Sequence, residues 1–448
     1  MSTLIGLDIG TTSISAVAVE SSTGALLRAV TVPNDSVLPS PDGVSRLQNP
    51  THIAKTTLAL KEALAVEFSP VAAIGVTGQM HGILYLDRAG RSVSPLYTWQ
   101  DGRGNLPYAG STYAGQLSAL SGYPLASGFG LVTHFINRAQ GLVPAKAVTF
   151  CTIQDYISML LTHRNTPLLH ASNGASFGCY DLAAHTFDSA AVEKLGLDES
   201  LLPAVTAETA VIGQDGSVPV AAAIGDNQAS VLGSLWEDGD ILVNIGTGSQ
   251  VSAVVSAPAP FPAGAVRPYV DGRFLLAGSP LCGGRAYALL HRFFARCAKR
   301  FGGDGRDAYD VMNDMAAEQP EDHPLTVDPR FCGTRNDPAL RGSISGISED
   351  NFTPEQLTRG VLWGMAAELH ELYRQMPLPS PAAGLVGSGN GVRKNSVLRQ
   401  YLEEQFGLKL KLPAHREEAA FGAAVFAAAA AGLYPDIPTA QASLLHYE

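Results

Sequence analysis

The sequence contains few cysteines, and they show no pairing motif. Five occur, an odd number, at Cys151, Cys179, Cys282, Cys297 and Cys332, and no two form a CxxC pair. A disulfide framework and a zinc site are therefore not expected. This usage of cysteine favours a reducing compartment, so we expect a cytoplasmic protein.

Basic residues are also scarce, since 30 Lys and Arg stand against 41 Asp and Glu, for a formal net charge of −11. A surface of that sign repels nucleic acids and anionic membranes, so neither is an expected partner. No basic stretch followed by a signal-type apolar core occurs near the N-terminus. The most membrane-like run, residues 419–434, is short and mostly alanine, which predicts a buried helix instead of a membrane span.

Glycine and proline are plentiful, with 46 and 28 residues respectively. They predict many tight connections, as in proteins whose strands and helices alternate. The chain of 448 residues also exceeds the size at which one hydrophobic core usually keeps growing. We therefore expect two domains.

A strand–turn–strand pattern occurs twice. Residues 4–20 (LIGLDIGTTSISAVAVE) and 241–255 (ILVNIGTGSQVSAVV) each read as an apolar strand, an I-G-T-x-S turn and a second apolar strand. Either turn alone could be only a glycine-rich hairpin. Two such turns about half a chain apart predict two related lobes facing each other across a cleft, with each turn cradling one side of a polyphosphate.

Strand-like and helix-like segments alternate after each hairpin. Strands are predicted at residues 72–77 and 83–86, and helices at residues 52–68, 226–236, 357–375, 395–406 and 418–430. Asp238-Gly239-Asp240 reads as a turn that introduces the second lobe. This turn places the domain boundary near residue 237.

Several motifs resemble those of the FGGY family of carbohydrate kinases, and the resemblance runs through most of the chain. Asp8-Ile9-Gly10-Thr11-Thr12 and residues 244–249 resemble the two phosphate loops of that family. Gly225-Asp226-Asn227-Gln228 resembles the segment that carries its catalytic base. The sugar-binding elements of its xylulokinase-like branch are similar to Gly78-Gln79-Met80-His81-Gly82 and Trp99-Gln100-Asp101-Gly102-Arg103. Its adenosine motif resembles Gly387-Ser388-Gly389-Asn390. Residues 152–156 and 173–178 add a resemblance, within this branch, to the kinases of seven-carbon ketoses.

The resemblance implies an α/β fold of two duplicated actin-like ATPase (ribonuclease H-like) lobes with an interlobe cleft. Residues 1–237 would form an N-terminal lobe that binds sugar and phosphate, and residues 238–448 a C-terminal lobe that binds ATP. The implied reaction transfers the γ-phosphoryl group of ATP, with Mg²⁺, to a hydroxyl of a small sugar. The expected acceptor is a ketose, with sedoheptulose first and xylulose or ribulose next.

Two acidic residues are the candidates for the chemistry. Asp8 ends an apolar strand, where a carboxylate is costly unless a cation lies beside it, so we predict that it binds Mg²⁺. The alternative is that Asp8 only accepts hydrogen bonds from turn amides. By resemblance, Asp226 is the general base and a second metal contact; from its residue type alone, it could equally be a helix N-cap.

The nucleotide contacts predicted from the resemblance lie on three loops. The first two are the glycine- and hydroxyl-rich turns, whose N–H and O–H groups can bind phosphate. The third would admit adenine or ribose, with a side-chain amide for the base edge. The residues are Gly10, Thr11, Thr12, Ser13, Gly246, Thr247, Gly248, Gly387, Gly389 and Asn395.

The predicted sugar contacts are Gln79, Met80, His81, Trp99, Asp101, Asp226 and Asn227. His81 could donate to a sugar oxygen, Trp99 offers a flat face to C–H groups, and Asp101 can accept from hydroxyls. A structural histidine and a core tryptophan are the alternatives for the first two. Arg103 either pairs with Asp101 or meets a phosphate.

The sequence also allows two other functions. One is a non-catalytic actin-like protein that binds ATP and sugar as a sensor or scaffold, and the other is a chaperone-type ATPase. The presence of both Asp8 and Asp226 weighs against the sensor, which needs no base. Sugar and ATP are the expected small-molecule partners, and the sequence leaves a homodimer open.

Overall fold

The computed structural model describes residues 2–302, 305–318, 325–334, 337 and 339–448, which form two compact units. Unit 1 contains residues 1–236, 267–274 and 417–445, and unit 2 contains residues 237–266, 275–416 and 446–448. The first division lies at the predicted boundary near residue 237. The later segments differ from the prediction, because residues 267–274 and 417–445 return to unit 1.

Unit 1 is built on a mixed sheet of seven strands in the order β16-β17-β6-β1-β2-β3, with β18 also paired to β6. These strands are β1 (Thr3–Ile9), β2 (Ser13–Glu20), β3 (Leu26–Pro33), β6 (Val71–Gly78), β16 (Val211–Asp215), β17 (Val218–Ala221) and β18 (Ile224–Gly225). The predicted first hairpin is confirmed, since β1 and β2 pair antiparallel from Thr3↔Glu20 to Ile9↔Ile14. The predicted strand at residues 72–77 is confirmed as β6, and part of 83–86 as β7 (Leu84–Leu86).

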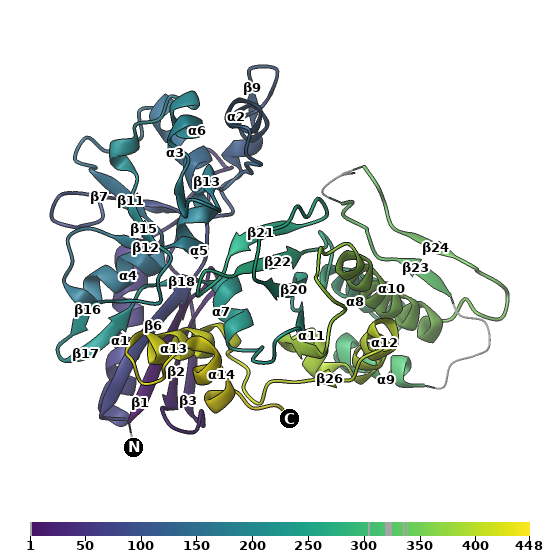
Figure 1. Cartoon of the computed structure of the whole chain (residues 1–448). Coiled ribbons are helices and arrows are strands. Elements are labelled where there is room, and N and C mark those ends of the chain that lie inside the picture. Colours follow the sequence, from purple (N-terminus) through teal and green to yellow (C-terminus); the bar gives the residue numbers. More distant parts are fainter. Residues whose placement is uncertain (1, 303–304, 319–324, 335–336, 338) are drawn as a thin grey trace. The chain divides into compact units, whose positions relative to one another are not determined.

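The alanine-rich helix α13 (Glu418–Ala430) covers this sheet, and its residues 420–428 are all buried. Figure 1 shows it in yellow against the purple strands. The approach is close because glycines face it: a Cβ on Gly6 or Gly75 would lie 1.8 Å from the carbonyl oxygen of Ala420 or Ala423, respectively. The predicted buried helix is therefore confirmed, and its packing explains why residues 417–445 belong to unit 1.

The remaining helices of unit 1 include α1 (Pro50–Glu67), α3 (Gly130–Ala139), α4 (Ile153–Thr162), α5 (Ala171–Gly174) and α7 (Asp226–Leu232). The helix predicted at residues 52–68 is confirmed as α1. The helix predicted at 226–236 is shorter, because the chain turns at Gly233, where a Cβ would lie 2.1 Å from the carbonyl oxygen of Glu418. Unit 1 also contains a small sheet of three strands, β4 (Val37–Leu38), β5 (Leu47–Gln48) and β8 (Leu96–Tyr97).

Unit 2 has a six-stranded sheet in the order β21-β22-β20-β19-β25-β26. Its strands are β19 (Ile241–Ile245), β20 (Ser249–Val255), β21 (Ala265–Pro268), β22 (Phe274–Gly278), β25 (Leu385–Ser388) and β26 (Leu410–Lys411). Its helices are α8 (Arg285–Phe301), α9 (Ala308–Ala317), α10 (Pro354–Arg374), α11 (Gly389–Lys394) and α12 (Ser396–Phe406). The second predicted hairpin is confirmed as β19–β20, and the helices predicted at 357–375 and 395–406 as α10 and α12.

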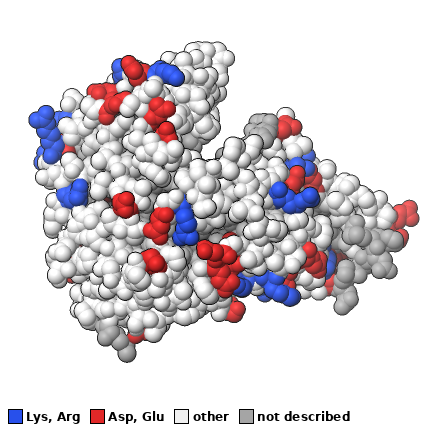
Figure 2. Space-filling model, viewed as in Figure 1, with Lys and Arg blue, Asp and Glu red and all other residues white. Residues whose placement is uncertain are grey.

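Two features of the described residues bear on partners. Among them, the longest apolar helices fall short of what a bilayer crossing requires. On the face drawn in Figure 2, the described Lys and Arg residues occur singly or in small groups among Asp and Glu.

Candidate active site

Three parallel strands of unit 1 end together and carry most of the predicted catalytic and sugar-binding residues. Gly78, the last residue of β6, is the register partner of both Ile9 in β1 and Gly225 in β18. Asp8 therefore lies at the end of β1, while Asp226 and Gln79 each follow directly on a strand end. Parallel strands bring their carboxyl ends to one edge of a sheet, where α/β proteins bind ligands.

The two acidic residues interact electrostatically and are desolvated. Burial, and then repulsion from Asp226 and Glu417, raise the pKa of Asp8 to about 7. Burial also raises the pKa of Asp226 to about 6, against the opposing effects of the Asn227 N–H group and the Arg267 guanidinium. Both side chains are only partly exposed. The fold thus places two desolvated carboxylates near each other. Their ionisation is energetically costly unless a cation lies beside them.

Asp226 does not act as the N-cap of its helix. Gly225 occupies that position with extended backbone, and Asp226 is the first residue of α7. One carboxylate oxygen, Oδ1, accepts a hydrogen bond of 2.8 Å from the N–H group of Asn227. The other oxygen is left for a ligand as far as the described hydrogen bonds show, which agrees with the predicted general base.

The first phosphate loop is braced from outside. The Nδ2 of Asn34 donates to the carbonyl oxygen of Gly10, and the Nε2 of Gln48 to that of Thr11, each at 2.8 Å. The Nε1 of Trp99 donates to the Oγ1 of Thr11, also at 2.8 Å. A cavity of about 360 Å³ lies beside Thr11, lined by parts of residues 37–48 and by Thr98 and Gln100. These contacts fix the turn, and the binding of phosphate by its N–H groups stays a prediction.

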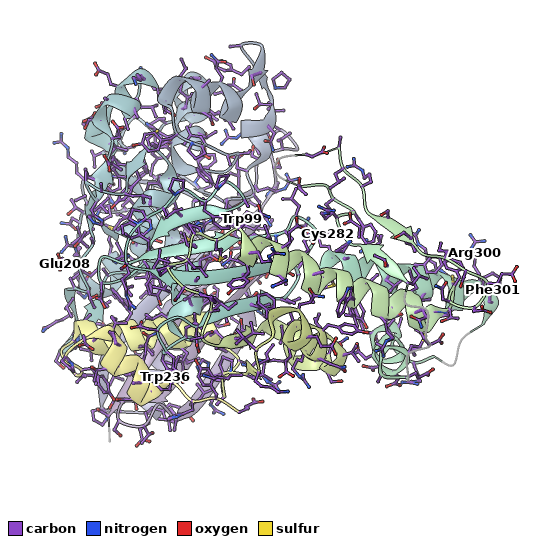
Figure 3. All side chains as sticks on the ribbon, turned by 45° about the vertical axis from the view of Figure 1, so that its right-hand side comes forward. Trp99, Glu208, Trp236, Cys282, Arg300 and Phe301 are labelled. Atoms are coloured by element: carbon purple, nitrogen blue, oxygen red, sulfur yellow. The ribbon has the colours of Figure 1, made fainter. Side chains whose placement is uncertain are left out.

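Trp99 is not a core residue. Its side chain, labelled in Figure 3, is 45% exposed. The hydrogen bond from its ring to Thr11 fixes the indole beside the phosphate loop. An exposed and oriented aromatic face of this kind suits the C–H groups of a sugar.

Gln79 and Met80 of the predicted sugar motif are both buried, and both contact neighbouring segments of unit 1. The Nε2 of Gln79 donates to Gln48 at 2.8 Å, and its Oε1 accepts from Thr11 at 3.2 Å. Gln79 therefore supports the phosphate loop, a role that its position in the sequence did not indicate. Met80 is buried, and its sulfur accepts a weak hydrogen bond from Asn227. This contact ties the motif to the segment that carries the base.

His81 is held by three contacts and has an unusual backbone conformation. Its φ angle is 71°, a conformation that non-glycine residues rarely adopt. Its N–H group donates to the Oγ of Ser176 at 3.0 Å, and its ring stacks on Phe129 at 4.5 Å. Its Nδ1 lies 2.7 Å from the carbonyl oxygen of Ser176, and since a carbonyl only accepts, Nδ1 carries a proton. The imidazole thus has one fixed orientation and a defined tautomer when neutral.

Beneath the strand ends lies a buried network that sequence reasoning did not single out. Asn173 donates to the carbonyl oxygen of Ala223 at 2.9 Å and to Asp155 at 3.2 Å. Gln154 donates to the Oδ1 of Asn173 and to the carbonyl oxygen of Gly78. The network joins the ends of β6 and β18 to the segment that holds His81. The motifs at 152–156 and 173–178 were visible, but nothing in them signalled this role.

The predicted contact of Asp101 with sugar hydroxyls is not supported. Asp101 is 2% exposed, and both of its carboxylate oxygens accept hydrogen bonds from Arg103, the shortest at 2.6 Å. Arg103 also donates to Asn137 and lies over the ring of Tyr97. The structure therefore resolves the open alternative for Arg103 in favour of a buried pair with Asp101. Such a pair has no capacity left for a ligand.

The predicted nucleotide loops of unit 2 also lie at one sheet edge. β19 and β25 are parallel, with Asn244 opposite Ser388, and the Nδ2 of Asn244 donates to the Oγ of Ser388 at 2.7 Å. Gly246, Thr247 and Gly248 are exposed, and a Cβ on either glycine would meet nothing within 4 Å. The predicted second phosphate loop and the predicted adenosine motif are therefore adjacent, and the space around Gly246 and Gly248 is unoccupied by other described residues.

The end of β25 passes directly into α11, so Gly387 lies within the strand instead of in a loop. Gly389 has a φ angle of 82°, and a Cβ there would lie 2.5 Å from the carbonyl oxygen of Ile245. Asn395 caps α12 through Leu398 and donates to Asn313. These contacts give Asn395 a structural role, and its contact with adenine stays a prediction.

Comparison with known proteins identifies the family. The N-terminal domain of the FGGY family of carbohydrate kinases matches residues 3–233, and the C-terminal domain matches residues 241–431. The chain belongs to the FGGY family of carbohydrate kinases. The predicted fold of two actin-like ATPase lobes, each on its own sheet, and the predicted ATP-dependent sugar kinase activity are thereby confirmed.

Individual relatives of this FGGY kinase include sedoheptulokinases. The mouse sedoheptulokinase is 30% identical, with 94% of this chain and 96% of that protein covered, and the human one is 27% identical over the same shares. The crystal structure of xylulose kinase from Rhodospirillum rubrum has a TM-score of 0.82 at 23% identity, covering 96% and 91% of the two chains. Plasmodium falciparum glycerol kinase with ADP has a TM-score of 0.80 at 18% identity, covering 99% of this chain and 92% of that one.

Proposed function

We propose that this FGGY kinase phosphorylates a ketose, with sedoheptulose as the preferred acceptor and xylulose or ribulose next. The observation that carries the proposal is the pair of desolvated carboxylates, Asp8 and Asp226, on adjoining strand ends of unit 1. A protein that only senses ATP and sugar has no need of a carboxylate base there. The identity of 30% to a sedoheptulokinase over nearly the whole chain supports the choice of acceptor.

Asp226 would act as the general base. Its carboxylate accepts the proton of the acceptor hydroxyl as that oxygen bonds to the γ-phosphorus and the bond to the β-phosphate oxygen of ATP breaks. A pKa near 6 suits this task, since the group is ionised at neutral pH and basic enough to take a proton. The N–H group of Asn227 orients the carboxylate through its hydrogen bond of 2.8 Å.

Asp8 would hold Mg²⁺, with Asp226 as a second contact. The residues fit this ion, because Mg²⁺ is usually bound by one or two carboxylates together with substrate phosphates. Among the described residues, no cluster of three or more metal-binding side chains exists, so phosphate oxygens would have to complete the coordination. A bound Mg²⁺ would neutralise phosphate charge and offset the repulsion that raises the pKa of Asp8.

The remaining predicted contacts divide between the two units. In unit 1, Gly10, Thr11, Thr12 and Ser13 would bind phosphate, and Met80, His81, Trp99 and Asn227 would contact the sugar. In unit 2, Gly246, Thr247, Gly248, Gly387 and Gly389 would bind the nucleotide. This division follows from the open space on the second loop and from the fixed orientations of His81 and Trp99.

We further propose a cytoplasmic location, in keeping with cysteines that are all free thiols. The acidic net charge of −11 suits neither nucleic acid nor an anionic membrane as a partner. A homodimer stays a prediction.

A ketose panel with coupled ADP detection tests the function. With Mg·ATP, we expect the highest kcat/KM for sedoheptulose, lower values for xylulose and ribulose, and the lowest for glycerol. A preference for a pentulose would retain the kinase and correct the acceptor. If no sugar raises ADP release above basal ATP hydrolysis, the kinase proposal fails. That result would favour a non-catalytic sensor of ATP and sugar.

A further inference from the structure

Two cysteines of unit 2 that are distant in sequence lie together. Cys282, labelled in Figure 3, precedes α8, and Cys332 lies in the turn after β23 (Thr326–Asp328). Their sulfur atoms are 3.7 Å apart, and the N–H group of Phe331 also donates to the sulfur of Cys282. A disulfide has an S–S distance of about 2.0 Å, so the sulfurs would approach by about 1.7 Å to form one.

Cys332 is carried by an anchored segment. The Phe331 N–H group donates to the carbonyl oxygen of Pro329 at 2.7 Å, and the Gly333 N–H group to that of Arg330 at 3.0 Å. The preceding strand β23 lies directly on α10, because a Cβ on Gly364 would be 2.2 Å from the carbonyl oxygen of Val327. These contacts order the turn that carries Cys332, so closure of the disulfide would draw on Cys282 as well.

Cys282 is joined directly to residues that support the second phosphate loop. A Cβ on Gly284 would lie 1.9 Å from the carbonyl oxygen of Gly246, and one on Gly283 would lie 2.6 Å from the backbone nitrogen of Ser249. No side chain separates the two segments at these points. A displacement of Cys282 is therefore transmitted to the residues that flank Thr247.

The two thiols differ in access. Cys332 is exposed, whereas Cys282 is 2% exposed, and burial raises the pKa of the Cys282 thiol to about 11. A soluble oxidant therefore meets Cys332 first. The separation of 3.7 Å places the buried Cys282 sulfur beside the site of oxidation, and its raised pKa makes closure of the disulfide the slower of the two steps.

We propose that Cys282 and Cys332 form a reversible disulfide that weakens nucleotide binding at the second phosphate loop. With hydrogen peroxide as oxidant, the Cys332 sulfur attacks one peroxide oxygen, the O–O bond breaks, and a sulfenic acid and one water form. The Cys282 sulfur then attacks the Cys332 sulfur and displaces the second water. Overall, two thiols and one hydrogen peroxide give one disulfide and two waters, and a dithiol reverses the step.

The expected effect is a rise in the Kd for ATP of about tenfold, smaller than the loss in rate of about a hundredfold that a misplacement near 1 Å of positioning groups can cause. The inference rests on the proposed nucleotide role of residues 246–248, but not on the identity of the acceptor. If ATP binds and no sugar is phosphorylated, the proposed function fails while this inference can still be tested.

The test treats the full chain with hydrogen peroxide and then maps its peptides without reduction. We expect a linked peptide containing Cys282 and Cys332, a higher Kd for ATP by calorimetry, and recovery of both after dithiothreitol. Cys332→Ser should bind ATP normally before treatment and become insensitive to peroxide. Cys297→Ser, which changes another thiol of unit 2 on α8, should respond like the parent protein.

Three outcomes would overturn the proposal. The first is the absence of the linked peptide from folded, peroxide-treated monomer. The second is a linked protein whose Kd for ATP equals that of the reduced protein. The third is a loss of affinity that persists in Cys332→Ser, because the loss would then come from another oxidised residue.

Discussion

At the scale of single residues, Asp226 is the side chain on which the proposed chemistry depends. Asp226→Ala should retain binding of ATP and sugar but lower kcat by roughly 10² or more, the usual contribution of a positioned acid–base group. Calorimetry and steady-state kinetics together check this. Normal turnover in a variant with normal binding would remove Asp226 from the role of base.

The same residue predicts a pH dependence. Because burial raises the pKa of Asp226 to about 6, the ionised base is lost as the pH falls through that value. We expect kcat/KM for the sugar to be flat above this region and to fall about tenfold per pH unit below it. An acid limb centred near the ordinary aspartate pKa would contradict a desolvated base.

The ionised Asp8 carboxylate should lower the free energy of unfolding. Its pKa is raised from 3.8 to about 7 in the folded chain, so folding favours the protonated form and stability declines as the pH rises between those values. Without Mg²⁺ at about pH 8, Asp8→Asn should be more stable by about 1–2 kcal/mol, less than the full shift implies because the group is partly open to water.

Thermal unfolding at two pH values checks this prediction. The difference between Asp8→Asn and the parent should shrink as the pH falls and vanish near about pH 3, below both the unfolded value of 3.8 and the folded value, where the parent carboxyl is mostly protonated in both states. Mg·ATP should stabilise the parent and not the variant. An equal or lower melting temperature for the variant at high pH would contradict the burial and repulsion that raise the pKa of Asp8.

Ser176 tests whether the orientation of His81 matters to the sugar. Ser176→Ala removes the hydrogen bond of 3.0 Å that helps to hold the backbone of His81 at a φ of 71°. We expect the KM for the ketose to rise several-fold, with little change in the KM for ATP. Ser176→Thr keeps the hydroxyl and should restore much of the loss, which a general packing defect would not allow.

At the scale of elements, the contact between α13 and the sheet depends on two glycines. Gly75→Ala would place a methyl group 1.8 Å from the carbonyl oxygen of Ala423, so α13 must move. We expect a loss in the free energy of unfolding of about 3 kcal/mol or more, at the upper end for overpacked sites. Denaturant unfolding measures it.

Gly216→Ala is the matched control for this prediction. Its φ angle is 63° and a Cβ there meets nothing within 4 Å, so it should lose only about 1 kcal/mol through backbone strain. Equal losses for Gly75→Ala and Gly216→Ala would mean that α13 does not approach the sheet as closely as described.

The sequence predicted the elements better than the side-chain partners. The two hairpins, β6, α1, α10, α12 and α13 were found because apolar periodicity and turn residues are local signals. Gln48 and Ser176 were missed because their importance comes from hydrogen bonds to residues 31 and 95 positions away. Asp101 was misjudged because a motif does not reveal that Arg103 uses both carboxylate oxygens.

At the scale of the whole molecule, unit 1 is not continuous in sequence, because residues 417–445 return to it after most of unit 2. Glu417, which adds to the charge around Asp8, and the helix that covers the first sheet both come from the last tenth of the sequence. A truncation after Arg416 should therefore abolish the folding of unit 1, even though every predicted sugar contact lies before residue 230. Solubility and circular dichroism of the truncated chain check this.

A shorter truncation is the control. Removing only residues 446–448 deletes the hydrogen bond from Ala414 to His446 and the bridge between Pro413 and Tyr447, both within unit 2. That protein should fold and retain its activity. If the chain ending at Arg416 also folds and phosphorylates sugar, α13 is not needed to complete unit 1.

The late position of α13 has a consequence for synthesis. When residue 236 has left the ribosome, the 180 residues from 237 to 416 still have to be made before the C-terminal segment of unit 1 begins. At typical elongation rates, the apolar face of the first sheet remains uncovered for on the order of ten seconds or more. The nascent chain is thus a natural client for chaperones during that interval, and its acceptor site can mature only as translation ends.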